Sequence, residues 1–433
     1  MAKSFREWDV DQALLFPPTV RDFVPPGHLA HFVRETVRES LDLSAIVGAY
    51  TEERGYPPYH PVMMTALLLY SYCQGIYSSR RIAKSCGERV DFMAITGMQQ
   101  PDFRTVSDFR KRHLQALSGL FVQVLRLCRK AGLAKLGHVS LDGSKVKANA
   151  SKHRAMSFKR MVEAERQLEA EVQGWLEQAG ALDAEEDRQF GADRSGFEMP
   201  DWVANKQKRL ETIRRAKAEL EAEATAGQEA KRQEPASEPS EKAVPKDSAQ
   251  RNFTDSESRI MKTGDGFVQG YNAQLVVDAE SQIIVAQALT QGSNDAPQLL
   301  PMVKQIKSNL GRQAQELSAD KGYCSEENLK HLSRRHIKAY VATGRQKHGQ
   351  SSATGSTKCP QGPRTQAMRT KLKRAGWRSR YRLRKQTVEP VFGQIKQARG
   401  FRQFLLRGLE KVAAEWSLIC IAHNFLKLAA AQR

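Results

Sequence analysis

Carboxylates at the ends of expected secondary-structure elements are the first sign of chemistry in this sequence. The stretch His138–Asn149 reads HVSLDGSKVKAN, in which Val139 and Leu141 are strand-like. Gly143 breaks the run directly after Asp142, which places one carboxylate at or near the end of a short buried strand. A single Asp before Gly is more often an ordinary turn residue, so this stretch alone does not define a site.

Two later stretches supply further carboxylates. Asp320 follows the apolar run 316–319, and Glu389 lies in the sequence TVEPVFGQIK, where Thr387 is the expected N-cap of a helix. Three carboxylates that are far apart in sequence, each at an element end, suit a shared divalent-metal site, because Mg²⁺ prefers carboxylate oxygens. Two Mg²⁺ or Mn²⁺ ions about 3.5–4 Å apart activate the nucleophile and stabilise the leaving oxygen in phosphodiester cleavage and transfer.

Two other aspartates compete with Asp320 for the second position. Asp278 lies at an expected hairpin tip, where Asp is common. Asp295, in the sequence SNDAP, is placed to act as the N-cap of the following helix. Asp320 is preferred because it directly follows an apolar strand.

The ordered carboxylates Asp142, Asp320 and Glu389, with their flanking residues, resemble the DDE transposases of bacterial insertion sequences. The catalytic core of that family is RNase H-like. The resemblance extends over most of the chain from about residue 60, apart from residues 151–255. It implies that these three side chains hold two divalent metal ions and act in catalysis.

A second motif narrows the resemblance to one branch of the family. Tyr381 and Arg384 precede Glu389, and Lys396 follows it after six intervening residues. This resembles the Tyr-Arg-Glu-Lys signature, although four residues separate Arg from Glu here instead of the usual three. The resemblance implies that Tyr381, Arg384 and Lys396 contact DNA.

The elements that position these residues fall into three parts. Residues 1–135 are expected to form an all-α N-terminal DNA-binding domain, and residues 136–150 and 256–433 the catalytic core. In the core, the strand of Asp142 is followed by an expected hairpin of strands 266–278 and 283–289, a helix near 299–310 and a strand at 316–319. The expected fold is α/β, an RNase H-like mixed sheet flanked by helices.

The third part, residues 151–255, is expected to be an insertion into the core. Apolar residues at helical spacing on either side of 191–200 predict a helical hairpin. Residues 221–250 are rich in Ala, Glu, Lys, Pro and Ser and predict a disordered linker. The hairpin could clamp DNA or support dimerisation, and a solvated spacer is the alternative.

Basic residues in the N-terminal part indicate a DNA-binding surface. An expected helix from Pro61, a turn at Gly75 and a short basic helix from Ser78 or Ser79 are typical of a helix-turn-helix. A plain helical bundle with a solvated basic face fits the same pattern. The expected DNA contacts here are Arg80, Arg81, Lys84, Arg110 and Lys111.

The net charge of the chain also indicates DNA as the partner. The net charge is +20, which indicates a polyanion: nucleic acid first and an anionic membrane surface second. A dense basic run from Arg364 to Lys385 precedes Glu389, and its arginines Arg378, Arg380 and Arg382 are expected to contact DNA.

The remaining composition points to a cytoplasmic protein. No stretch is long and apolar enough to span a bilayer, and the N-terminus lacks the apolar segment of a signal peptide. Six scattered cysteines without a Cys-x-x-Cys pair favour reduced thiols over a zinc site or disulfides.

Together these features predict a bacterial, nucleoid-associated DNA transposase. It is expected to bind terminal inverted repeats as a homodimer on double-stranded DNA, to hydrolyse the phosphodiester at the element ends and to join the freed 3′-hydroxyl to target DNA. An RNase H-like nuclease without strand transfer, or a catalytically silent DNA-binding regulator, are the rival interpretations. The three carboxylates argue against the regulator.

Overall fold

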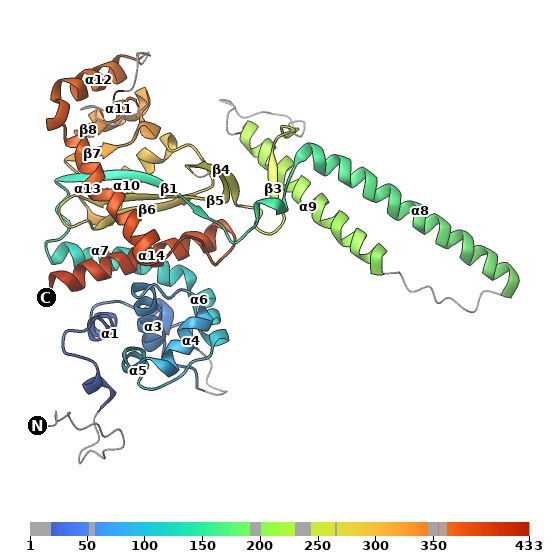
Figure 1. Cartoon of the computed structure of the whole chain (residues 1–433), viewed down its shortest axis with the longest axis horizontal. Coiled ribbons are helices and arrows are strands. Elements are labelled where there is room, and N and C mark those ends of the chain that lie inside the picture. The colour runs from blue at the N-terminus through green and yellow to red at the C-terminus, as the bar shows by residue number, and fades with distance from the viewer. Residues whose placement is uncertain are drawn as a thin grey trace, which may run out of the picture.

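The computed structural model describes residues 19–51, 57–190, 201–229, 244–264, 266–344, 354 and 362–432, with the backbone alone for 179–190. An N-terminal group of helices lies against a sheet flanked by helices, and a long helical hairpin projects away from both (Figure 1).

The N-terminal group is all helical, as expected. Its helices are α1 (Leu29–Glu39), α2 (Ser44–Val47), α3 (Pro61–Cys73), α4 (Ser79–Glu88), α5 (Val90–Thr96), α6 (Phe103–Arg112) and α7 (Leu114–Lys130). Local sequence explains several ends: Pro61 opens α3, Asp102 caps α6 by accepting the N–H groups of Arg104 and Thr105 at 2.6 and 2.8 Å, and Gly97 ends α5 at φ 59°.

The central sheet has six strands in a mixed arrangement. They are β1 (His138–Lys147), β4 (Arg259–Thr263), β5 (Gly266–Asp278), β6 (Ile284–Thr290), β7 (Glu316–Ala319) and β8 (Lys338–Val341). The order is β4-β5-β1-β7-β8, and β6 also pairs with β5. β5 runs antiparallel to β1, β4 and β6, whereas β7 is parallel to β1 and β8. The predicted α/β fold class, a mixed sheet flanked by helices, is confirmed.

One glycine permits the close pairing of the two longest strands. A Cβ at Gly270 of β5 would lie 2.4 Å from the carbonyl oxygen of Val146 in β1, so any side chain there would force the strands apart.

Helices α10 (Leu299–Leu310), α11 (Glu326–Arg334), α12 (Pro363–Ala375), α13 (Leu383–Gly393) and α14 (Leu409–Ala431) complete the core. α14 is buried along almost its whole length and packs on α3, α7 and β6, so it lies between the N-terminal helices and the sheet (Figure 1). Both parts share one continuous hydrophobic core. The N-terminal unit is therefore joined to the core by packing as well as by chain.

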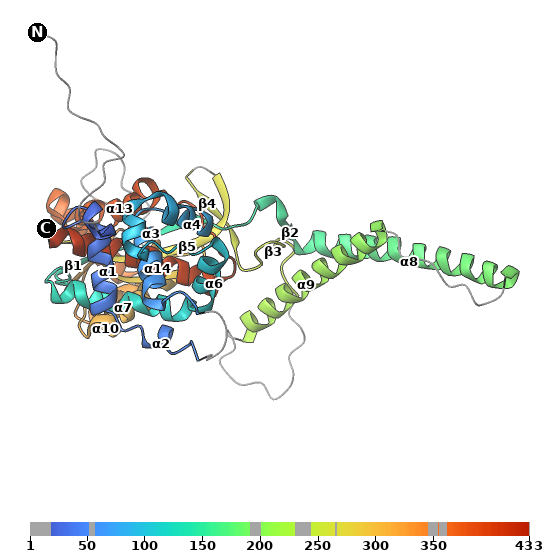
Figure 2. The same ribbon diagram turned by 90° about the horizontal axis from the view of Figure 1, so that it is seen from below.

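The insertion is a helical hairpin, as predicted. α8 (Phe158–Phe190) and α9 (Asp201–Glu229) run antiparallel and extend well beyond the rest of the molecule (Figure 2). Their contact has its own apolar cluster, made of Phe158, Met161, Leu168, Leu210, Ile213, Ala216 and Leu220. The expected disordered linker at 221–250 is wrong at its start, because α9 continues to Glu229; residues 230–243 lie outside the described residues.

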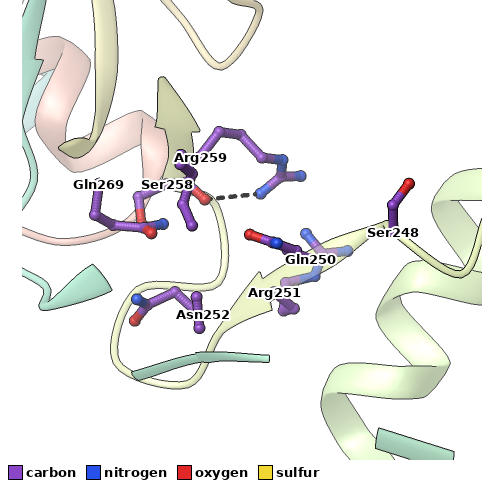
Figure 3. Close-up of a pocket in the computed structure, with 9 residues that line it drawn as sticks. Ser248, Gln250, Arg251, Asn252, Ser258, Arg259 and Gln269 are labelled. Carbon is purple, nitrogen blue, oxygen red and sulfur yellow. Dashed lines mark hydrogen bonds between the residues drawn. The ribbon is translucent and has the colours of Figure 1, made fainter. Parts of the chain in front are cut away.

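Ion pairs hold the base of this hairpin to the sheet. Glu223 of α9 pairs with Arg251 of β3 (Gln250–Asn252) and with Arg259 of β4, each at 2.9 Å. β3 pairs in turn with β2 (Ala155–Ser157), which precedes α8. Beside these arginines lies a pocket of about 220 Å³, lined by polar side chains that include Asn252 and Gln269 (Figure 3).

Two compositional expectations can be compared with the structure. Across the described ranges, no helix is long and apolar enough to cross a membrane. The five cysteines described are free thiols, and Cys359 lies outside the described residues.

Candidate active site

Two of the three expected carboxylates come from neighbouring parallel strands. β1 and β7 pair in register from His138 with Glu316 to Leu141 with Ala319. Asp142 is the next residue of β1, and Asp320 follows the last residue of β7. The parallel register therefore brings Asp142 and Asp320 to the same edge of the sheet.

Glu389 reaches the same place from α13, which packs across β1. Its expected position at the start of a helix is wrong, because α13 begins at Leu383 and Glu389 lies inside it. Thr387 is not the N-cap; its hydroxyl donates to the Leu383 carbonyl at 2.7 Å.

Pro390 is tolerated inside α13 because a distant side chain replaces the missing donor. A proline at this position cannot donate to the carbonyl of Gln386, four residues earlier. The side-chain amide of Gln282, from the turn after β5, donates to that carbonyl at 2.9 Å. Directly after α13 the chain adopts a π-helical turn at Gln394–Ala398.

Arg384 joins the carboxylates. Its Nη1 donates to Oδ2 of Asp142 at 2.7 Å, and its Nη2 lies 2.9 Å from Oε1 of Glu389. Only 12% of the Arg384 side chain is exposed, against 44% for Glu389. Arg384, which is expected to contact DNA, lies among the catalytic candidates.

Burial and neighbouring charges shift the pKa values of the site residues. Burial raises the pKa of Asp142 to about 6; Arg384 opposes this increase, and the Asp320 carboxylate adds to it. Burial lowers the pKa of Arg384, but the carboxylates led by Asp142 raise it overall.

The donor set fits a hard divalent cation in chemistry. Asp142, Asp320 and Glu389 offer only carboxylate oxygens, and a cationic group already lies between two of them. In the part of the chain that the structure describes, no three His, Cys, Asp or Glu side chains are grouped closely enough to hold a metal ion. The guanidinium of Arg384 balances part of the negative charge of the cluster.

Lys396, from the π-helical turn after α13, contacts β1 next to Asp142. Its Nζ donates to the hydroxyl of Ser144 at 2.5 Å and to the carbonyl of Lys145 at 3.0 Å. Burial lowers the pKa of Lys396, and the nearby Asp142 opposes this effect. The expected DNA-contacting lysine is thus held two residues from Asp142.

The two competing aspartates have structural partners. Asp278 is buried and accepts the N–H groups of Leu136 and Glu280 at 2.8 and 3.0 Å, so it stabilises the ends of β1 and β5. Neither bond connects Asp278 to Asp142, Asp320 or Glu389.

Asp295 lies beside the site, although it makes no N-cap bond. One of its oxygens accepts from Lys145, Asn272 and Gln274 at 3.2, 2.7 and 2.9 Å. A Cβ at Gly143 would lie 2.9 Å from the same oxygen, so Gly143 is needed where β1 passes this cluster.

Sequence reasoning missed a line of polar side chains under the site. His138 bonds Glu316 at 3.2 Å and Ser318 at 3.0 Å, and Ser140 bonds Ser318 at 2.9 Å. Arg380 completes it by donating to Glu316 at 2.5 Å. The signal was present in the sequence: β1 reads His-x-Ser-x-Asp and β7 with the next residue reads Glu-x-Ser-x-Asp, which places polar residues on one face of each strand.

Not all of the predicted DNA contacts are exposed. Arg380 is exposed but pairs with Glu316, whereas the Tyr381 side chain is buried. Arg110 is buried as well, donating to the Tyr72 hydroxyl at 3.2 Å and the Tyr77 carbonyl at 3.1 Å. Its position in a basic run gave no indication of this burial.

The other basic candidates are exposed. They are Arg80, Arg81, Lys84, Lys111, Arg378 and Arg382. Arg80 stacks on Phe103 of α6, 5.2 Å from the ring centroid, so α4 and α6 present one surface. Lys111 pairs with Asp108 at 3.3 Å on the exposed side of α6.

A mixed sheet with carboxylates at one strand edge and on a crossing helix defines an RNase H-like nucleic-acid-processing domain. Comparison with protein families agrees: a transposase DDE domain matches residues 238–425, and a transposase domain (DUF772) matches residues 18–112. The chain belongs to the DDE transposases of insertion sequences.

The matched ranges do not include every site residue. Asp320 and Glu389 lie inside the DDE match, whereas β1 with Asp142 precedes the helical hairpin and lies outside both ranges. No curated protein and no solved structure matches the chain significantly.

Proposed function

We propose that this transposase binds the terminal inverted repeats of its element, hydrolyses the phosphodiester at each end and transfers the freed 3′-hydroxyl to target DNA. The convergence of Asp142, Asp320 and Glu389 around Arg384 carries the proposal. Three distant stretches bring acidic side chains to one end of the sheet although like charges repel, and titratable groups with shifted pKa values are concentrated at functional sites.

Asp142, Asp320 and Glu389 would hold two Mg²⁺ or Mn²⁺ ions. When bound, such ions activate the attacking oxygen and stabilise the leaving one. Lys396, held beside Asp142, is placed to attract a DNA phosphate into the site. The mostly buried position of Asp142 limits solvent around the reacting centre, which strengthens electrostatic interactions there.

The exposed basic surface of α4 and α6 is proposed to recognise the element ends. Arg80, Arg81 and Lys84 lie on α4, with Lys111 nearby on α6. Arg378 and Arg382, near the carboxylates in sequence, are proposed to hold the DNA backbone. A homodimer in the DNA complex and a place in the bacterial cytoplasm with the nucleoid are part of the same proposal.

A joining assay tests the proposal. Purified protein, Mg²⁺ and a duplex carrying the inverted repeats that flank the gene should yield cut ends and products joined to a target plasmid. Cut ends without joined product would favour the nuclease, and binding without cutting would favour the regulator. Alanine replacements of Arg80, Arg81 and Lys84 should reduce the preference for the repeat over random duplex.

A further inference from the structure

Arg384 occupies the carboxylate oxygens that a metal ion would need. Its guanidinium is bonded to Oδ2 of Asp142 and paired with Oε1 of Glu389, and the charge of Asp320 also acts on it. With this arginine in place, the four side chains retain two units of negative charge. The cluster is therefore only partly neutralised.

Binding a divalent ion and the guanidinium to the same oxygens at once is energetically unfavourable. Two cations about 4 Å apart repel each other strongly in a site largely shielded from water. Ligation of Asp142 and Glu389 by a metal ion would therefore weaken both contacts of Arg384 and favour its departure.

Arg384 is not fully satisfied where it lies. Its Nε is buried without a hydrogen-bond partner, while both Nη groups point to carboxylates. A phosphate accepts two parallel N–H bonds from one guanidinium, and such a contact would employ the idle Nε–H. The Nε–H is therefore a buried donor that its present partners leave unused.

We infer that Arg384 exchanges partners: it neutralises Asp142 and Glu389 in the metal-free protein and moves to a DNA phosphate when metal binds. The inference rests on the proposed function. It makes metal binding and DNA binding cooperative, because each event removes the competitor of the other. By reciprocity, DNA must then raise metal affinity by the same factor.

Calcium binding without DNA tests whether Arg384 competes with a metal ion for the carboxylates. Isothermal titration with Ca²⁺ should give about tenfold tighter binding for Arg384→Gln than for the wild type, because the internal competitor is gone. Arg378→Gln, an exposed arginine of the same basic run, should bind Ca²⁺ like the wild type. Equal Ca²⁺ affinity of Arg384→Gln and wild type would overturn the exchange.

The salt dependence of DNA binding tests whether Arg384 moves to a DNA phosphate when metal binds. A fluorescein-labelled random duplex is titrated across a salt series in EDTA and in Ca²⁺, with a gel to show that the DNA stays uncut. The slope of log affinity against log salt should be smaller for Arg384→Gln than for wild type by about 0.9 in Ca²⁺, and equal to wild type in EDTA. Arg378→Gln should show the same deficit in both buffers, since its contact does not depend on metal.

The outcomes separate this inference from the proposed function. A deficit of Arg384→Gln that is identical in EDTA and Ca²⁺, including none, would overturn the exchange while leaving transposition intact. Failure of every variant to bind duplex would count against the proposed function itself. If Arg384→Gln does not fold, as judged by circular dichroism, Arg384→Lys replaces it, because lysine keeps the charge but cannot bridge both carboxylates; it too should tighten Ca²⁺ binding.

Discussion

At the scale of single residues, the sequence identified acidic side chains better than basic ones. Asp142 and Asp320 could be predicted because each follows an apolar strand, and the parallel register of β1 and β7 then brings them together. The burial of Arg110 could not be predicted from the sequence. It depends on Tyr72 and Tyr77, which only tertiary packing brings against α6.

Replacing Asp142 by Asn should abolish DNA cleavage while leaving affinity for end DNA within a few-fold of the wild type. Metal ligation needs the carboxylate charge, whereas affinity comes mainly from phosphate contacts of Lys and Arg. Cleavage gels and fluorescence anisotropy measure the two effects. Glu327→Gln, an exposed carboxylate of α11, is the matched control and should cut normally. Wild-type cleavage by the Asn variant would remove Asp142 from the site.

At the scale of elements, α13 shows why local sequence was insufficient. Pro390 suggested a helix start, yet the helix continues because Gln282, over a hundred residues earlier, satisfies the Gln386 carbonyl. The same helix region is anchored to the sheet at two points, by Arg380 on Glu316 and by Arg384 on Asp142.

We expect the buried Glu316 to contribute more to the free energy of unfolding than its exposed partner Arg380 does. Glu316 is nearly buried and accepts from both Arg380 and His138, so Glu316→Gln should lower the free energy of unfolding by about 2 kcal/mol. Arg380 is 56% exposed, so Arg380→Gln should lower the free energy of unfolding by less than Glu316→Gln does. Urea denaturation compares them; a larger loss for Arg380→Gln would mean that the pair does not act through the buried carboxylate.

Glu415 in α14 should make stability depend on pH. It is fully buried and accepts the N–H groups of Leu405 and Leu406. Burial raises its pKa to about 7, although these bonds and Arg110 oppose the increase. A carboxyl with a raised pKa binds its proton more tightly in the folded state, so its contribution is present at low pH and is lost as pH rises toward 7.

Glu415→Gln should remove this component. Between pH 4.5 and 7, the wild type should lose about 3 kcal/mol more stability than the variant, and at pH 8 the variant should be at least as stable. Urea denaturation at a series of pH values measures the difference. Parallel pH profiles for the two proteins would show that Glu415 is ionised in the fold throughout this range.

At the scale of the whole molecule, two hydrophobic clusters divide the chain. One runs through the N-terminal helices, the sheet and α14, and the other lies inside the α8–α9 hairpin. The sequence predicted the hairpin because its apolar residues keep helical spacing. It did not show that α14 joins the N-terminal helices to the sheet, since a helix buried on all sides has no polar face to identify its partners.

Shortening the hairpin should leave the rest folded. Deleting residues 172–206 and closing the helices with a short Gly-Ser linker retains every buried residue of the hairpin's apolar cluster, including Met161 and Ile213. The melting temperature of the main transition should stay within about 2 °C in calorimetry, because the hairpin has an apolar cluster separate from that of the core. A large decrease would reveal that the distal hairpin supports the core. DNA affinity of the same variant then shows whether the hairpin holds DNA.

The buried position of α14 also bears on how the protein is made. Cys73 of α3 bonds the carbonyl of Ala422, 349 residues later, and Asn424 binds the backbone of Ile284 in β6. Contacts so distant along the chain form late and slowly. A nascent polypeptide that already carries its basic N-terminal helices therefore still lacks the helix that completes their core until α14 (Leu409–Ala431) has been synthesised.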